Sequence, residues 1–246
     1  MTFIFVIGPA YNNLNTLLDT INNNNKLLKN IKHFYIPTND RNIYTYFQNQ
    51  KCYNNITCNF FCENQGHQLS CYNCIIAGMK MLLLDDNQKN DDVVIFSHED
   101  CYLKDLSLFD KAIDKLKTYD IVCREFNAKR QNKQNYYMND TFFINKNIIH
   151  NTFQHLEILN NFENEKNAKN RFCEYFFSKN ISKLNIFSIL YDHVTWADTE
   201  LGFYHIPSRI CTELEWDKKN INDIAKQIDI PEEALIVYGN DKAKIN

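Results

Sequence analysis

Short apolar runs alternate with amphipathic stretches through the first 125 residues of this chain of 246. Between the runs, apolar residues recur at helical spacing in three series, which begin at Leu14, Leu69 and Leu106. This alternation predicts an α/β fold in which a mostly parallel central sheet is flanked by helices. The predicted strands are Phe3–Ile7, His33–Ile36, Ile56–Cys62, Val93–Ser97 and Ile121–Glu125.

After Glu125 the pattern changes. Asn127–Asn139 is rich in Asn, Gln and Lys and predicts a surface loop that can close over a ligand. A strand at Thr141–Ile144, a helix carrying Phe172, Tyr175 and Phe176 on one face, and a strand at Ile186–Leu190 are expected to follow.

We therefore expect one domain over residues 1–215, divided near residue 125 into two halves, 1–125 and 126–215. A C-terminal helical extension is expected over 216–246, with one helix after Trp216 and another beginning at Pro231.

Composition narrows the class of protein. The chain is 44% hydrophobic, which is enough for a sizeable core without metal or disulfide cross-links. Its 27 basic and 30 acidic residues are spread along the sequence, and this argues against a nucleic-acid-binding protein, which needs a concentrated basic face. The apolar run at Phe3–Ile7 stops at Gly8-Pro9, too early for a membrane span or a signal segment, so no transmembrane segment is expected.

Nine cysteines at irregular spacing, without a secretion signal, indicate reduced thiols and a cytoplasmic location. The pairs Cys58-x3-Cys62 and Cys71-x2-Cys74 also allow a zinc site of four thiolates. However, the first pair falls in a strand-like run and the second in a helix-like run, with no turn residues to form a zinc knuckle. Free thiols are the favoured interpretation.

In open α/β sheets, ligands bind beyond the carboxyl ends of the strands, so the segments that follow the predicted strands are the candidates for a site. After the first strand, Pro9 shapes a turn and Tyr11 can lie against a base, although an ordinary strand-to-helix turn explains them equally well. After the second, Asp40 can accept hydrogen bonds from a nucleoside or cap a helix.

The segment after the third predicted strand contains Asn64, Gly66 and His67. Gly66 permits close approach of the backbone to a ligand, and a helix that begins here would favour a nearby negative group.

The fourth strand ends abruptly in His98-Glu99-Asp100, which we call the acidic triplet. Carboxylates at the end of a strand gather oxygen ligands for Mg²⁺ or Mn²⁺, which can bridge a diphosphate. A solvated turn is the alternative interpretation.

The order of these segments resembles that of GT-A-fold glycosyltransferases. Pro9-Ala10-Tyr11-Asn12 matches the Pro-x-Tyr-Asn that follows their first strand, Asn64-Gln65-Gly66 matches their Asn-x-Gly segment, and the acidic triplet stands where they carry an Asp-x-Asp metal motif. The triplet departs from that motif at its first position, which is His98.

The resemblance implies a metal-dependent enzyme that transfers a hexosyl or deoxyhexosyl group from a nucleotide-diphosphate sugar to a hydroxyl of a glycan or other acceptor. Mn²⁺ or Mg²⁺ would be held by Asp100, with His98 as a further ligand and Glu99 near the nucleotide. His205 lies where many such enzymes supply a late histidine ligand. Residues 1–125 would then be the donor-binding half and residues 126–215 the acceptor half. The donor side would be formed by Pro9, Tyr11, Asp40, Asn64, Gly66, His67 and Glu99.

The segment Thr195–Gly202 resembles the later acidic segment of inverting members. There a carboxylate deprotonates the acceptor hydroxyl. Asp198 is the first candidate for this base and Glu200 the second, and Trp196 can stack on a sugar ring.

Two other functions remain open from the sequence. A sugar-phosphate nucleotidyltransferase shares the α/β sheet and acidic metal ligands, but its phosphate loop is normally rich in Gly and basic residues, unlike Gly8-Pro9-Ala10-Tyr11. A catalytically inactive GT-A-like module that binds nucleotide sugars is the second alternative, and His98 in place of the first acid motivates it.

Overall fold

The computed structural model describes residues 1–50, 54–63, 67–85, 92–126, 135–149, 173–191, 201–205, 235–237 and 243–245. The chain divides into two compact units, Met1–Ile206 and Pro207–Asn246, so the division lies nine residues before the predicted end of the first domain at 215. Among the described residues, no helix is both long and apolar enough to cross a membrane.

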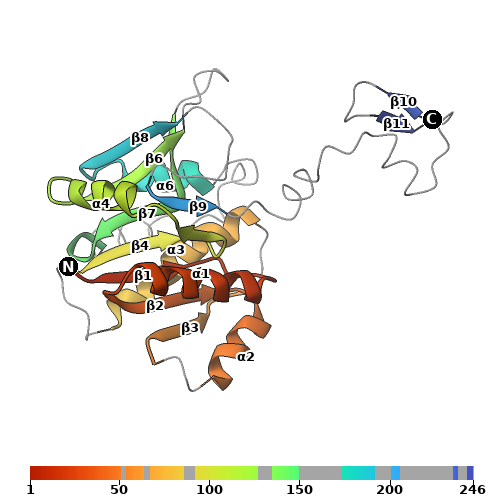
Figure 1. Ribbon diagram of the computed structural model, residues 1–246, viewed down its shortest axis with the longest axis horizontal. Helices are drawn as coiled ribbons and strands as arrows, with labels where there is room; N and C mark the ends of the chain where they lie inside the picture. The colour runs from red at the N-terminus through yellow and green to blue at the C-terminus, as the bar shows by residue number, and fades with distance from the viewer. Residues whose placement is uncertain are drawn as a thin grey trace, which may run out of the picture. The chain divides into compact units, whose positions relative to one another are not determined.

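A seven-stranded sheet forms the centre of the first unit (Figure 1), in the order β3-β2-β1-β4-β7-β6-β8. Within this sheet, β7 runs antiparallel to its neighbours β4 and β6, and the other neighbouring strands are parallel. The predicted α/β architecture is therefore confirmed. The strands are β1 (Phe3–Ile7), β2 (Ile31–Thr38), β3 (Ile56–Phe60), β4 (Val93–Ser97), β6 (Ile121–Phe126), β7 (Tyr136–Asn145) and β8 (Ile186–Tyr191).

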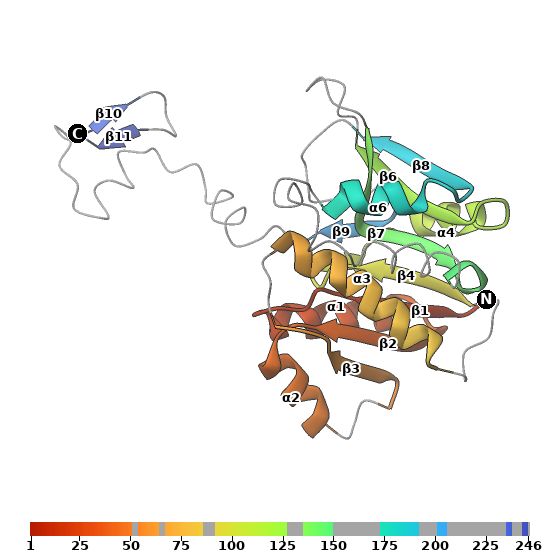
Figure 2. The ribbon, with the colours of Figure 1, turned by 180° about the vertical axis from the view of Figure 1, so that it is seen from behind.

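Helices cover both faces of the sheet. α1 (Leu14–Leu27) and α4 (Leu106–Lys115) lie over the face seen in Figure 1, and α3 (His67–Leu83) and α6 (Cys173–Ile181) over the face seen in Figure 2. α2 (Arg41–Asn49) lies beside β3.

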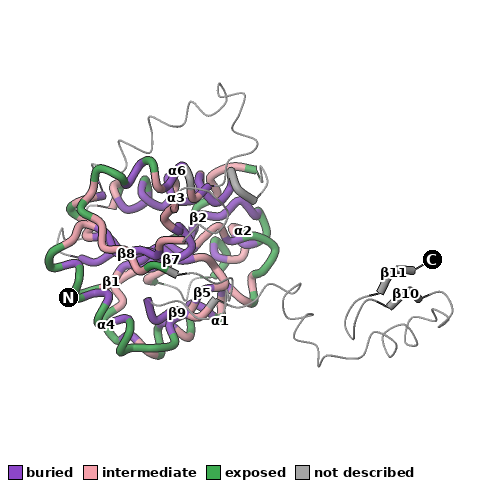
Figure 3. The backbone as a smooth tube through the Cα atoms, turned by 90° about the horizontal axis from the view of Figure 1, so that it is seen from above, coloured by how far each residue is buried: buried purple, intermediate pink, exposed green. Residues whose placement is uncertain are grey.

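The two faces form two apolar cores because successive strand residues point to opposite sides. In β1, Phe5 and Ile7 belong to the core under α1 and α4, whereas Ile4 and Val6 belong to the core under α3 and α6. Viewed from above, the buried segments run through the middle of this unit and the exposed ones line its outside (Figure 3).

Strands β1 and β4 have the predicted bounds, and α1, α3 and α4 lie where helical spacing placed them. The prediction of a loop over Asn127–Asn139 is wrong at its C-terminal end, because β7 already begins at Tyr136. Met138 and Asn139 are buried there, and Tyr136 and Tyr137 pair with β6. The polar composition of this stretch therefore hid the start of a strand. Residues 127–134 lie outside the described residues.

A short two-stranded sheet accompanies the main one. β5 (Cys101–Leu103), directly after the acidic triplet, pairs antiparallel with β9 (Phe203–His205). α1 supports β5, because Asn23 Nδ2 donates to the carbonyl of Leu103 (2.7 Å) and the N–H of Leu103 donates to Asn24 Oδ1 (2.8 Å). The periodicity of the sequence did not predict this sheet.

In the second unit the described residues form two antiparallel strands, β10 (Leu235–Val237) and β11 (Ala243–Ile245), where we expected a helical extension. The positions at which those helices were expected to begin, Trp216 and Pro231, lie outside the described residues.

Candidate functional site

The loops after β1, β2 and β4 meet at the carboxyl edge of the sheet, where we expected a ligand site. Gly8 donates its N–H to the carbonyl of Ser97 (2.9 Å), which joins the end of β1 to the end of β4. A Cβ at Gly8 would lie 2.5 Å from Cys74 Sγ and 2.8 Å from the carbonyl oxygen of Pro37. Only glycine fits this approach without displacing the backbone of β2.

Asp40 braces the loop that follows β1. Its Oδ1 accepts from the N–H of Asn42 (2.7 Å) and of Ile43 (3.4 Å), which caps α2, and its Oδ2 accepts from the N–H of Asn12 (2.8 Å). Asn12 has a φ of 56°, a left-handed conformation that asparagine tolerates better than most residues. The helix-capping interpretation of Asp40 is thus what the structure shows, and the same carboxylate fixes the backbone beside Tyr11.

Thr38 adds a second brace, since its hydroxyl donates to the carbonyl of Ala10 (2.6 Å) and accepts from the N–H of Asp40 (3.0 Å). Tyr11, by contrast, is 41% exposed at this edge, as a side chain available to stack on a base would be. Pro9 follows Gly8 through a cis peptide bond in the same turn.

Asn39 lies between these two bracing residues, and sequence reasoning did not select it. It is 4% exposed, and within the described part of the chain neither its Oδ1 nor its Nδ2 has a hydrogen-bond partner. Buried polar groups in proteins are nearly always paired, so an amide that leaves both a donor and an acceptor unsatisfied requires an explanation. In the sequence, Asn39 stands directly after a predicted strand and next to the candidate Asp40, and this position could have identified it.

The acidic triplet forms a tight turn between β4 and β5. The N–H of Cys101 donates to the carbonyl of His98 (3.1 Å), and Thr20 Oγ1 on α1 donates to the carbonyl of Glu99 (2.7 Å). All three residues of the triplet are half-buried. Backbone contacts therefore fix the turn, as expected for a segment that positions charged side chains.

A buried ion pair lies next to the triplet and was also not selected from the sequence. Arg124 on β6 pairs with Asp140 on β7, and their side chains are 2% and 3% exposed. The carbonyl of Asp140 accepts from the N–H of His98 (3.0 Å), so the pair and the triplet are in direct backbone contact.

Two thiols beside the site remain protonated. Burial raises the pKa of Cys101 well above its ordinary value, with Asp100 and Asp140 acting in the same direction, and Cys101 Sγ lies 3.9 Å from Asp100 Oδ1. Burial and Glu99 likewise raise the pKa of Cys74. Burial raises the pKa of Cys58 in β3 to about 12, which disfavours the thiolate that a zinc site needs.

The acidic triplet is where we expected a divalent metal ion. Within the described part of the chain, no group of three or more His, Cys, Asp or Glu side chains is arranged to hold a metal ion. The triplet still offers two carboxylates and an imidazole, and Mg²⁺ is commonly held by one or two carboxylates together with substrate phosphates and water. The donor set therefore fits an ion that arrives with a diphosphate and does not fit an ion caged by protein alone.

His205 belongs to β9, and in the register of β5 and β9 it stands opposite Cys101, directly after the triplet. The structure thus brings the backbone of a predicted late ligand next to the predicted metal motif. His67 begins α3; the side chains of His67 and His205 are not among those described. Asn64, Gly66, Asp198 and Glu200 lie outside the described residues.

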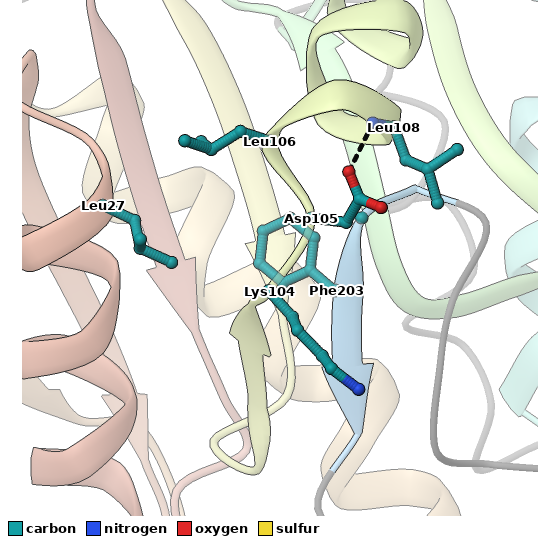
Figure 4. Close-up of a pocket in the computed structure, with 7 residues that line it drawn as sticks. Leu27, Lys104, Asp105, Leu106, Leu108 and Phe203 are labelled. Carbon is teal, nitrogen blue, oxygen red and sulfur yellow. Dashed lines mark hydrogen bonds between the residues drawn. The ribbon is translucent and has the colours of Figure 1, made fainter.

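A cavity of about 490 Å³ lies between the end of α1, the start of α4 and the β5–β9 sheet (Figure 4). Leu27, Leu106, Leu108 and Phe203 give it an apolar wall, and Lys104 is its basic residue. The carboxylate of Asp105 is used to cap α4 through the N–H of Leu108 (3.0 Å). None of the residues predicted for the site lines this cavity.

Comparison with known proteins identifies the fold. No family model and no curated protein matches the sequence. Among solved structures, the galactosyltransferase LgtC, in complex with donor and acceptor sugar analogs, aligns over 95% of this chain and 98% of its own with a TM-score of 0.53 and 12% identity. This chain has a GT-A-like fold.

A second solved structure resembles the chain to the same degree. It is 4-diphosphocytidyl-2C-methyl-D-erythritol synthase from Anaerococcus prevotii, which aligns over 87% of this chain and 95% of its own, with a TM-score of 0.53 and 12% identity. The GT-A-like fold is therefore shared with proteins named for different reactions, and the residues of the site have to discriminate between them.

Proposed function

We propose that the protein is a glycosyltransferase that transfers a sugar from a nucleotide-diphosphate donor to an acceptor hydroxyl, with inversion at the anomeric carbon. The observation that carries this proposal is the position of the acidic triplet. It follows β4 at the carboxyl edge of a GT-A-like sheet, beside the braced loops after β1 and β2. This edge is where such sheets bind ligands.

The loop after β1 favours glycosyl transfer over nucleotidyl transfer. The residues from Gly8 to Asn13 include no Lys or Arg, and a hydrogen bond to the carboxylate of Asp40 holds their backbone. A nucleotidyltransferase has to bind a nucleoside triphosphate, whose extra charge calls for basic residues and backbone N–H groups in this loop. A nucleotide-sugar donor carries only a diphosphate, so it needs fewer basic residues. The aromatic ring of Tyr11 and the buried amide of Asn39 suit the base of such a donor.

In the proposed donor complex, Tyr11 stacks on the base and the amide of Asn39 pairs with its edge, since nucleobases present adjacent donors and acceptors there. Asp100 is the main protein ligand of Mn²⁺ or Mg²⁺, with His98 and His205 as further candidates and Glu99 near the ribose. When bound, the ion neutralises negative charge on the diphosphate leaving group.

On the acceptor side, Asp198 is the proposed general base. The acceptor oxygen forms a bond to the anomeric carbon, the bond from that carbon to the diphosphate breaks, and the hydroxyl proton passes to the carboxylate of Asp198. Glu200 is the alternative base. Whichever residue is the base, the loops after the strands bind the donor, so loss of the base should not weaken donor binding.

The proposed activity is tested by incubating the protein with a panel of nucleotide sugars and Mn²⁺. Release of a nucleoside diphosphate, faster with an acceptor, supports a glycosyltransferase. Release of sugar phosphate that depends on pyrophosphate would show a nucleotidyltransferase instead. Binding of a nucleotide sugar without turnover would show the inactive module.

The proposed base is tested by comparing Asp198→Asn with Glu200→Gln. We expect Asp198→Asn to lower turnover by about 10²–10⁴-fold, the usual effect of losing a positioned base, with little change in donor affinity. Glu200→Gln is the matched control and should keep most of the turnover. Near-normal turnover in Asp198→Asn, or a product that retains the donor's anomeric configuration, would overturn this mechanism.

A further inference from the structure

Glu125 lies near the carboxyl end of β6, on a part of the site edge that the proposed donor complex does not use. Its side chain is half-buried, and both carboxylate oxygens accept a hydrogen bond: Oε1 from Asn135 Nδ2 (2.9 Å) and Oε2 from the hydroxyl of Ser188 (2.7 Å). Both donors are uncharged, and among the described residues no Lys, Arg or His forms an ion pair with Glu125. Each carboxylate oxygen has two lone pairs, so each can accept one further hydrogen bond.

The register of the sheet places Glu125 level with the acidic triplet. Phe96 of β4 and Cys123 of β6 both stand opposite Phe142 of β7, so these two residues are at the same level along the sheet. β4 and β6 run in the same direction, and Glu125 lies two residues beyond Cys123, as His98 lies two residues beyond Phe96. Two strand spacings separate β4 from β6, which is roughly 10 Å. A ligand of the size of a small saccharide can span this distance.

An aromatic and an aliphatic residue flank this carboxylate. In register, Tyr137 of β7 stands opposite Glu125 on one side and Leu190 of β8 on the other, and side chains that are opposite in a sheet share a face. We call these three residues the Glu125 row. Tyr137 is half-buried, whereas Leu190 is 55% exposed, so the row reaches solvent at β8.

The composition of the Glu125 row suits a carbohydrate. A sugar ring presents hydroxyl groups at its edge and apolar C–H groups on its faces, so it is bound by polar acceptors together with aromatic or aliphatic surface. The carboxylate supplies the acceptor, and the hydrogen bonds from Asn135 and Ser188 fix its orientation before a ligand arrives.

We propose that the Glu125 row binds a carbohydrate acceptor, with Glu125 accepting a hydrogen bond from one of its hydroxyl groups. This inference rests on the proposed function and narrows its acceptor from any hydroxyl compound to a saccharide. The hydroxyl that Glu125 holds is not the one that reacts, and Asp198 remains the proposed base. Glu125 therefore acts on acceptor affinity and leaves the donor to the loops after β1, β2 and β4.

The test measures acceptor kinetics with the nucleotide sugar that the donor panel identifies and with a set of neutral mono- and disaccharides. We expect a saccharide to accelerate release of the nucleoside diphosphate by the wild-type protein. Glu125→Gln should raise the KM for that saccharide by about tenfold or more, the effect of losing a hydrogen bond to a charged group. The Mn²⁺-dependent affinity for the nucleoside diphosphate, measured by calorimetry, should be unchanged.

Asp120→Asn is the matched control. Asp120 is also a half-buried carboxylate, it lies directly before β6 at the other end of that strand, and its Oδ2 accepts from the N–H of Asn185, next to β8 (2.9 Å). This variant should leave the KM for the saccharide unchanged. Glu125→Asp, which keeps the charge on a shorter side chain, should give a KM between those of the wild type and Glu125→Gln.

Leu190→Ser keeps the inference testable if Glu125→Gln does not fold. It changes an exposed side chain, so the fold should survive, and we expect it to raise the same KM by about threefold through lost apolar contact. Donor affinity should again be unchanged.

The outcomes distinguish this inference from the proposed function. Turnover of a nucleotide sugar that none of the saccharides accelerates would overturn the inference alone. An unchanged KM in Glu125→Gln, or in Leu190→Ser where Glu125→Gln does not fold, would also overturn it. So would equal losses of acceptor and donor affinity in Glu125→Gln with a lower Tm, because they indicate structural damage. Absence of turnover with every nucleotide sugar would overturn the proposed function, and this inference with it.

Discussion

The two edges of the central sheet differ in the hydrogen bonding of their buried polar groups. At the amino edge, Asp92 is 1% exposed and fully engaged: Oδ1 accepts from the hydroxyl of Thr2, Oδ2 pairs with Lys32 (3.0 Å), and its carbonyl accepts from the N–H of Lys146 (3.0 Å). The N–H of Val93 donates to the carbonyl of Thr2 (3.1 Å). Through its carboxylate and its backbone, Asp92 thereby joins the starts of β1, β2 and β4 and the end of β7.

At the carboxyl edge, several enclosed polar atoms have no partner among the described residues. Such atoms belong to Asn39, which follows β2, to Ser97, which ends β4, and to Asn139, where the pairing of β7 with β6 is irregular. The carboxylate of Asp92 has no such atom. An unsatisfied buried group lowers stability, so the presence of several of them at the carboxyl edge favours a ligand site there.

The largest expected effect comes from removing a charge at the carboxyl edge. Asp100→Asn should abolish Mn²⁺-dependent binding of a nucleoside diphosphate, because the carboxylate is the main proposed ligand of the ion. The fold should survive, since backbone contacts hold the turn. Calorimetry with and without Mn²⁺, alongside thermal unfolding, measures both. Unchanged Mn²⁺ dependence would remove Asp100 from the site.

The corresponding change at the amino edge should have the opposite profile. Asp92→Asn leaves Lys32 without its carboxylate, and we expect a loss of about 2 kcal/mol, below the value for a fully buried pair because the side chain of Lys32 is 30% exposed. In a unit of this size that lowers the Tm by about 4–8 °C. Nucleotide affinity should be unaffected. A Tm equal to that of the wild-type protein would show that the two edges differ less than we infer.

The smallest effect should have opposite signs in stability and in binding. Asn39→Leu replaces an unsatisfied amide by an apolar side chain of similar size, so the free energy of unfolding should rise by about 1 kcal/mol. Affinity for the preferred nucleoside diphosphate should fall by about tenfold, the value of one or two lost hydrogen bonds. Asn42→Leu, at the exposed start of α2, is the control. If Asn39→Leu lowers stability and leaves affinity unchanged, the amide serves the fold.

The parts of the fold predicted well are those where local pattern decides the structure. Val93–Ser97 is an apolar run of strand length that stops at three polar residues, so both its bounds and the position of the triplet followed from the sequence. The helix over Leu106–Lys115 likewise follows from an apolar residue every three or four positions.

The parts that were missed depend on contacts between distant segments. Arg124 and Asp140 are 16 residues apart and meet where β6 pairs with β7. Nothing in an Asn-rich stretch distinguishes a buried Asn139 from an exposed one. Three residues of β5 are too few for an apolar pattern to emerge. Asn39 was passed over because its significance lies in missing hydrogen bonds, which a sequence does not display.

The pairing of β5 with β9 has a consequence for the order in which the molecule forms. Gly202, at a φ of 88°, accepts from the N–H groups of both Lys104 (2.8 Å) and Asp105 (2.9 Å), and a Cβ there would lie 2.3 Å from the carbonyl oxygen of Asp105. Residues about one hundred positions apart are thereby fastened together beside the acidic triplet. Contacts of such long range form late in folding. On a ribosome, the sheet can assemble before this junction, and the region of the triplet is completed only after the segment around Phe203 has been synthesised.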